Sequence, residues 1–157
     1  MQEHGLKISE LVTLFNLEVL NRGSDYDTAL LTITDVNRPG LQFHSFYDYF
    51  DPRRLQVLGK AEITYLKGLT TEQRRKCFDD LFLYDIPALV ISRGLDCFPE
   101  CLESARVHER TLLRTEETTV EFTSHTIEYL NRVLAPCVTR HGVLLDISGE
   151  GVMITGD

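Results

Sequence analysis

The amino-acid sequence predicts one α/β domain in which helices flank a mixed or partly parallel β-sheet. Apolar residues make up 43% of the 157-residue chain and charged residues 25%, close to the average for soluble globular proteins. Apolar residues recur at helical spacing in several segments, and short β-branched apolar runs separate these segments. A chain of this length buries about 70% of its unfolded surface, so a proper core is expected.

The first predicted helix lies near the start of the chain. Four apolar residues share one helical face there: Ile8, Leu11, Val12 and Phe15. Residues 17–20 alternate apolar and polar, and residues 29–34 form a β-branched run, so both segments are predicted strands. Arg38-Pro39-Gly40 then predicts a turn, because proline fixes φ and glycine permits tight conformations.

An aromatic segment follows this turn. Its members are Phe43, Phe46, Tyr47, Tyr49 and Phe50. Core packing is the commonest reason for such density, and a ligand pocket or a subunit contact are the alternatives. Another short apolar run, residues 55–58, precedes Gly59.

Two capping boxes mark the later helices. Thr70 and Gln73 have the spacing in which each side chain satisfies an amide of the other, and this helix should end near Tyr84. Thr118 and Glu121 repeat the spacing before a long amphipathic stretch that Pro136 should stop.

Two strands and one helix are predicted between the capping boxes. Residues 86–91 are nearly all apolar, as expected for a strand covered on both faces. Pro99 is expected early in a helix, and residues 111–114 predict a further strand.

A boundary is expected after residue 135. Beyond it, the apolar runs 142–147 and 152–155 flank Ser148-Gly149-Glu150-Gly151, which has the length and chemistry of a hairpin connection. We therefore predict a first domain over residues 1–135 and the start of a second over residues 136–157.

Charge and cysteine content restrict the partners. Sixteen basic and twenty-four acidic residues give a net charge of -8, which argues against nucleic acid or an anionic membrane as the main partner. The sequence predicts neither a membrane span nor a signal peptide, so the cytoplasm is the expected compartment. Its four cysteines are expected to be reduced thiols. Cys97 and Cys101 lack a third ligand nearby, so helix-start thiols are favoured over a zinc site.

The last residues match the beginning of a phosphate-binding loop. In such loops a strand runs into Gly-x-x-x-x-Gly-Lys-Ser/Thr, whose amides, lysine and hydroxyl hold phosphates and magnesium. Residues 152–155 are a plausible strand and Gly156 a plausible first glycine, but no lysine follows in this sequence. The pattern alone is a weak signal.

Segments along nearly the whole chain nevertheless resemble bacterial HPr kinase/phosphorylases. They are residues 16–20, 38–41, 46–50, 57–62, 92–95, 112–115, 129–130, 134–136, 139–146, Gly149, Gly151 and 154–157. The resemblance implies a Mur-ligase-like amino-terminal domain followed by the first β-hairpin of a P-loop kinase domain.

The resemblance also implies an activity for the parent protein. Such enzymes phosphorylate a regulatory serine of the carrier protein HPr with ATP or pyrophosphate and Mg²⁺, and reverse this by phosphorolysis, in carbon catabolite repression. The family is cytoplasmic and hexameric. By matching position, His141 belongs to the active site, and Gly156 and Asp157 begin the ATP-binding loop. No metal ligand is expected within the chain, which should itself be inactive and bind no cofactor.

Other interpretations remain open. Without the resemblance, His141 is more simply a polar residue at a strand start. Arg38 and Arg93 each lie beside a glycine and either bind an anion or, as we favour, anchor their loops. His44, His108 and His125 are expected to be surface or hydrogen-bonded residues. The whole chain could instead be a stand-alone regulatory or assembly module that binds a small ligand or protein.

Overall fold

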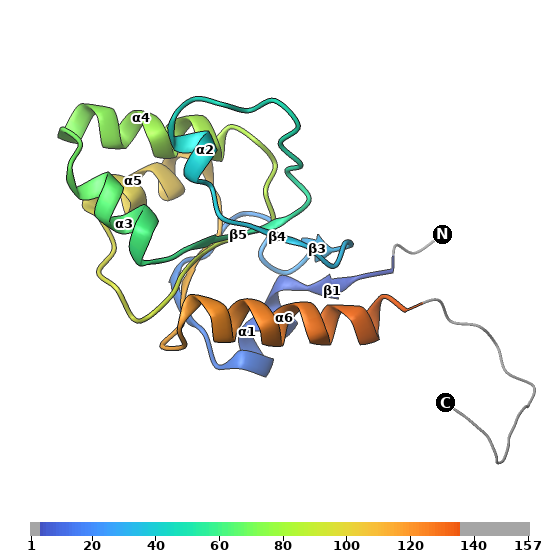
Figure 1. Cartoon of the computed structure of the whole chain (residues 1–157). Helices are drawn as coiled ribbons and strands as arrows, with labels where there is room; N and C mark the ends of the chain where they lie inside the picture. The colour runs from blue at the N-terminus through green and yellow to red at the C-terminus, as the bar shows by residue number, and fades with distance from the viewer. Residues whose placement is uncertain (1–3, 136–157) are drawn as a thin grey trace, which may run out of the picture.

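The computed structural model describes residues 4–135, which form seven strands and six helices. The elements are β1 (Leu6–Lys7), α1 (Ile8–Phe15), β2 (Glu18–Asn21), β3 (Leu30–Leu31), β4 (Val36–Asn37), α2 (Gly40–Phe43), β5 (Leu55–Leu58), α3 (Lys60–Lys67), α4 (Thr71–Phe82), β6 (Leu89–Ile91), α5 (Pro99–His108), β7 (Leu112–Arg114) and α6 (Thr119–Val133). Helices α2 to α5 lie on one side of the molecule, and α1 and α6 on the other (Figure 1).

Five strands form the central sheet, in the order β2-β7-β6-β5-β4. The pairs β4–β5, β5–β6 and β6–β7 are parallel, whereas β2 pairs antiparallel with β7 at one edge. A separate two-stranded sheet pairs Leu6 with Leu31 and Lys7 with Leu30. The predicted α/β class and the mixed sheet flanked by helices are therefore confirmed for the described residues.

Each face of the sheet has its own apolar cluster, because successive strand residues point to opposite faces. Leu58, Leu89 and Leu112 pack against α4 and α5. Their neighbours in sequence, including Val57, Val90 and Leu113, pack against α1 and α6.

Helices α4, α5 and α6 begin at the capping and proline signals that predicted them. Thr70 Oγ1 accepts a hydrogen bond from the amide of Gln73 at 3.1 Å, and Thr118 Oγ1 accepts one from Glu121 at 3.1 Å. Pro99 is the first residue of α5, where its missing N–H costs nothing.

The strand predictions were correct in place but too long in two cases. Only Leu30–Leu31 of the predicted strand over residues 29–34 pairs in a sheet, and only Leu89–Ile91 of residues 86–91. The predicted turn at Arg38-Pro39-Gly40 continues directly into the short helix α2. Helix α3 and strands β1 and β4 had not been predicted.

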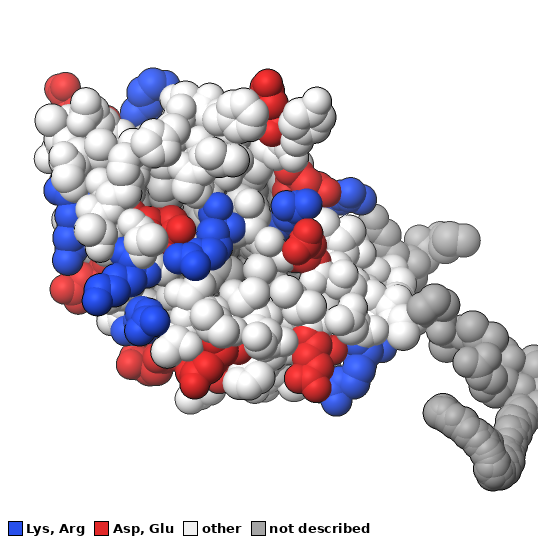
Figure 2. All heavy atoms as spheres, viewed as in Figure 1, with Lys and Arg blue, Asp and Glu red and all other residues white. Residues whose placement is uncertain are grey.

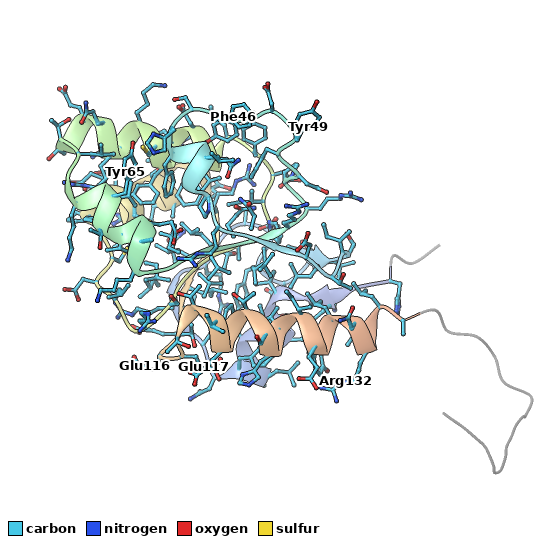
Figure 3. The ribbon with its side chains drawn as sticks, viewed as in Figure 1. Phe46, Tyr49, Tyr65, Glu116, Glu117 and Arg132 are labelled. Atoms are coloured by element: carbon cyan, nitrogen blue, oxygen red, sulfur yellow. The ribbon has the colours of Figure 1, made fainter. Side chains whose placement is uncertain are left out.

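The aromatic segment divides between core and surface. Phe43 is 4% exposed, and Tyr47 and Phe50 pack against the same cluster, so core packing is confirmed for these three. Phe46 and Tyr49 are 45% and 99% exposed and project outward from the loop after α2 (Figure 3). The predicted hairpin over residues 142–155 lies outside the described residues.

Candidate functional site at the carboxyl ends of the parallel strands

Four parallel strands end at one edge of the sheet, which is where open α/β sheets usually bind ligands. The loop after β4 carries Arg38, and β5 is followed by Gly59. The loops after β6 and β7 contribute residues 92–94 and 115–118. This carboxyl edge is the candidate functional site of the described part of the chain.

Two buried hydroxyls join the loops at its centre. Ser92 Oγ donates to the carbonyl oxygen of Leu58 at 2.8 Å and lies 2.6 Å from Thr119 Oγ1. Ser92 is 0% exposed and Thr119 5% exposed. Strand β6 is thereby tied to strand β5 and to the first turn of α6.

Gly59 lies where no side chain fits. A Cβ atom there would lie 2.5 Å from Arg38 Nη2 and 2.6 Å from Thr119 Oγ1. The glycine thus lets the loop after β4 and the start of α6 approach the end of β5.

Arg38 anchors its loop, as the sequence had favoured. Its Nη2 donates to Glu62 Oε1 at 2.9 Å, and the amide of Gly59 donates to the same oxygen at 2.7 Å. Glu62 therefore caps α3 and neutralises Arg38 at once. Side-chain exposure is 43% for Arg38 and 10% for Glu62, so the carboxylate is the buried partner.

Arg93 and Gly94 form a left-handed turn at φ values of 61° and 59°. Arg93 N donates to Glu117 O at 2.7 Å, and Gly94 N donates to Thr115 O at 2.8 Å. Both bonds fix this loop against the segment before α6. A Cβ atom on Gly94 would lie 2.7 Å from Glu116 Oε1, so glycine suits both the conformation and the space.

The Arg93 side chain faces solvent. No carboxylate of residues 4–135 lies within ion-pair distance of it, and in this range only the Arg93 backbone, not its guanidinium, holds the loop. The side-chain anchoring that the sequence favoured is therefore not seen among the described residues, and anion binding stays the alternative. Acidic side chains are close by: Figure 3 shows Glu116 and Glu117 in the loop before α6, and Figure 2 shows mixed charge across this face. The edge is electrostatically balanced rather than strongly basic.

The described histidines have ordinary partners. His125 Nδ1 lies 3.1 Å from Glu117 Oε2, and His108 Nε2 lies 3.3 Å from Asp79 Oδ1. His44 lies against Tyr65, with ring centres 4.5 Å apart and ring planes tilted by 39°.

The described part of the carboxyl edge has no hydroxyl or thiol bonded to a histidine, so it contains no nucleophile and base in contact. Among residues 4–135, no three His, Cys, Asp or Glu side chains are grouped to hold a metal ion. No helix in this range is both long and apolar enough to cross a membrane.

The predicted site residues His141, Gly156 and Asp157 lie outside the described residues, so their roles stay predictions. Sequence reasoning did not identify Glu62, Ser92 or Thr119. The spacing of Gly59 and Glu62 was only a weak signal for a helix start, because glycine has no side chain to complete a capping box. The contact between Ser92 and Thr119 depends on the order of the strands, which no local pattern encodes.

The fold and this edge define an α/β domain built on a mixed sheet, and sequence comparison assigns it to a family. The family model described as "HPr Serine kinase N terminus" matches residues 6–130. The chain belongs to this family.

Curated relatives agree with this assignment. HPr kinase/phosphorylase of Alkaliphilus metalliredigens is 43% identical over 151 residues, covering 96% of this chain and 48% of the relative. The protein of the same name from Clostridium beijerinckii is 42% identical over 153 residues, covering 98% and 50%. The chain thus spans about half the length of the curated relatives it matches.

The fold also occurs in a solved structure from another protein. It contains the CBS and DRTGG domains of the regulatory region of a Clostridium perfringens pyrophosphatase, in complex with the activator diadenosine tetraphosphate. The TM-score is 0.57 at 12% identity, over 87% of this chain and 51% of that chain.

Proposed function

We propose that the parent protein is a bifunctional HPr kinase/phosphorylase. It transfers phosphate from ATP or pyrophosphate, with Mg²⁺, to a regulatory serine of HPr and removes it by phosphorolysis, as part of carbon catabolite repression. The observation that carries this proposal is identity of 40 to 43% with proteins of that name over nearly the whole of this chain.

The chain itself is proposed to be non-catalytic and to bind neither nucleotide nor Mg²⁺. Phosphoryl transfer depends on positioning and on neutralisation of phosphate charge by metal and cationic groups. At the described carboxyl edge, Arg38 is already neutralised by Glu62. Residues 1–135 are proposed as the amino-terminal domain, and His141, Gly156 and Asp157 as parts of the kinase site that follows.

The assembly and location follow from the same proposal. HPr is the protein partner, the whole enzyme forms a homo-oligomer, a hexamer by analogy with the family, and the compartment is the cytoplasm. Neither nucleic acid nor membrane is a proposed partner, since the chain carries a net charge of -8.

A phosphotransfer assay tests the activity of the chain. The purified 157-residue protein is incubated with HPr, Mg²⁺ and labelled ATP, beside a full-length kinase from a Clostridium relative as the positive control. We expect labelled HPr only with the full-length kinase. Labelling by the chain would contradict the proposed inactivity.

The reading frame tests the parent protein. If the natural gene continues beyond Asp157 into a loop with lysine and serine or threonine, the encoded protein should phosphorylate HPr. A continuation that lacks such a loop, or a full-length protein with no HPr kinase activity, would overturn the proposal.

The second candidate function is a stand-alone regulatory or assembly module. It is favoured by the occurrence of the same fold in the regulatory region of a pyrophosphatase. A natural gene that stops at Asp157 would decide for this alternative.

A further inference from the structure

A tight turn in the loop after α2 presents Asp48 and Tyr49 at its tip. The amide of Phe50 donates to the carbonyl oxygen of Tyr47 at 3.0 Å, which closes a four-residue turn. The rings of these two end residues pack against Tyr84, with ring centres 5.0 and 4.9 Å away, and against each other at 5.4 Å. The aromatic contacts hold the base of the turn and thereby fix where its tip lies.

Tyr49 occupies a position in this turn that suits a tyrosine poorly. Its φ is 63°, and the third residue of a turn with a positive φ is usually glycine or asparagine. Its side chain is 99% exposed and projects away from the rest of the chain (Figure 3). Neither the backbone conformation nor packing within the chain accounts for a large aromatic side chain here, which points to a contact with another molecule.

The surface around the tip is apolar and carries one uncompensated negative charge. Phe46 and Leu41 are 45% and 62% exposed, and the amide of Phe46 donates to the carbonyl oxygen of Leu41 at 3.0 Å, so they are neighbours. Asp51 is paired with Arg53 at 2.8 Å, whereas Asp48 belongs to no ion pair within residues 4–135. A surface that fits this tip should offer an apolar hollow and a cation.

The outer face of α5 has such a hollow. Its volume is about 710 Å³, and it is lined by Pro99, Leu102, Glu103, Arg106 and Val107. Three of these residues are apolar, and Val107 is 69% exposed. Glu103 is neutralised by Arg75 at 2.9 Å, whereas Arg106 has no ion-pair partner in the described part of the chain. The hollow therefore combines apolar walls with one uncompensated guanidinium.

We propose that copies of this chain associate head to tail, with the tip of the turn in one copy bound in the α5 hollow of the next. The Tyr49 ring covers Leu102 and Val107, and the Asp48 carboxylate pairs with Arg106. The contact is independent of the function proposed for the parent protein.

The charges favour this arrangement over a symmetric contact between two tips. A symmetric contact brings two Asp48 carboxylates together, and like charges repel across an interface. Tyr49 is 99% exposed, so it does not bind in the hollow of its own chain. A head-to-tail contact leaves one tip and one hollow free, so the assembly grows or closes into a ring.

Sedimentation velocity of the 157-residue chain over a range of concentrations measures the association. We expect the mean mass of the unaltered chain to rise with concentration. Tyr49→Gly suits the left-handed turn and should fold, but it should weaken association by about tenfold or more. A chain that stays monomeric up to its solubility limit, or a Tyr49→Gly variant that associates as the unaltered chain does, would overturn the proposal.

Two exposed valines provide a matched pair for the hollow. Val107→Ser should weaken association, because Val107 lines the hollow. Val120→Ser should leave it unchanged, because Val120 is on α6 and is 70% exposed, nearly the same as Val107. Equal effects of the two substitutions would show that the α5 hollow is not the binding surface.

A mixture of two variants tests the head-to-tail arrangement. Tyr49→Gly keeps an intact hollow and Arg106→Glu keeps an intact Tyr49, so each variant should be mainly monomeric alone. Together they should form a heterodimer through the one intact tip and the one intact hollow. Association of Arg106→Glu alone, or the absence of a heterodimer in the mixture, would contradict the proposed contact.

A charge exchange tests the ion pair. Asp48→Lys and Arg106→Glu each place like charges opposite each other in the proposed contact, so each should weaken association. The double variant restores opposite charges and should regain association, and circular dichroism checks that all three variants fold. A folded double variant that associates no better than the single variants would refute the pairing of Asp48 with Arg106 and the contact built on it.

Discussion

At the scale of single residues, the ion pair between Arg74 on α4 and Glu100 on α5 is expected to affect stability strongly, because both side chains are largely buried. Arg74 Nε donates to Glu100 Oε1 at 2.8 Å, and the two side chains are 14% and 11% exposed. Arg74 also donates to the carbonyl oxygens of Leu66 and Leu69, at 3.0 and 3.2 Å. Removal of the carboxylate would leave a partly desolvated guanidinium without its negative partner, bonded only to backbone carbonyl oxygens.

We therefore predict that Glu100→Gln lowers the free energy of unfolding by about 2 kcal/mol at pH 7. The pKa of Glu100 is lowered, chiefly by the hydrogen bond from Arg74. A lowered carboxyl pKa contributes stability that is present above the unfolded value of 4.5 and is lost as pH falls through the folded value. The difference in the free energy of unfolding between the unaltered chain and the variant should therefore disappear in that acidic range.

Urea unfolding between pH 3 and pH 7 measures this difference. Glu103→Gln is the matched control, because its pair with Arg75 spans the same two helices at 2.9 Å with side chains 60% and 40% exposed. We expect the control to change stability by less than about 0.5 kcal/mol. An equal loss of unfolding free energy in both variants, or a loss in Glu100→Gln that does not change with pH, would contradict the prediction.

At the scale of elements, α6 combines one satisfied and one unsatisfied buried hydroxyl. Thr126 is 0% exposed, lies one turn from both Phe122 and Leu130, and its Oγ1 has no hydrogen-bond partner within residues 4–135. Thr119, at the first turn of the same helix, is bonded to Ser92. The same substitution at the two positions should therefore have opposite effects.

We predict that Thr126→Val raises the free energy of unfolding by about 1 kcal/mol, because it replaces an unsatisfied hydroxyl by a methyl group of similar size. Thr119→Val should lower it by about 1 kcal/mol, because it removes a buried hydrogen bond. Urea unfolding of both variants at pH 7 measures the two changes. Shifts of the same sign would refute this account of the helix.

The elements also show what the sequence could predict. Helices α4 and α6 carry both a capping box and an apolar stripe, so the sequence predicts where they start and about how long they are. Helix α3 is short, and only its residues Glu62, Ile63 and Leu66 are buried. Its N-cap residue is Gly59, which has no side chain to cap the helix. Its local signal was correspondingly weak.

Tertiary pairing decided the remaining elements and the site. Strand β4 has two residues and exists through pairing with β5. The anchoring role of Arg38 was one of two predicted alternatives, and the choice depended on Glu62, which lies 24 residues further along the chain. Ser92 and Thr119 meet only because β5, β6 and α6 adjoin, which requires the strand order.

At the scale of the whole molecule, the two apolar clusters of residues 4–135 lie on opposite faces of one sheet. Helix α6 supplies Phe122 and Leu130 to the cluster on its face, and Val133 and Leu134 complete that cluster. The buried members of the opposite cluster lie between residues 43 and 112. Since β5, β6 and β7 each contribute residues to the cores on both sides of the sheet, the described residues should unfold as one cooperative unit.

This arrangement makes the proposed boundary after residue 135 testable. We predict that a chain of residues 1–135 unfolds in a single transition, with a midpoint in urea within experimental error of that of the full chain. A chain of residues 1–117 lacks α6 and exposes one face of the sheet, so it should not fold. Circular dichroism and intrinsic tyrosine fluorescence report both transitions. A large loss of stability on removal of residues 136–157 would show that these residues belong to the first domain, and the boundary would then have to move toward the carboxyl end.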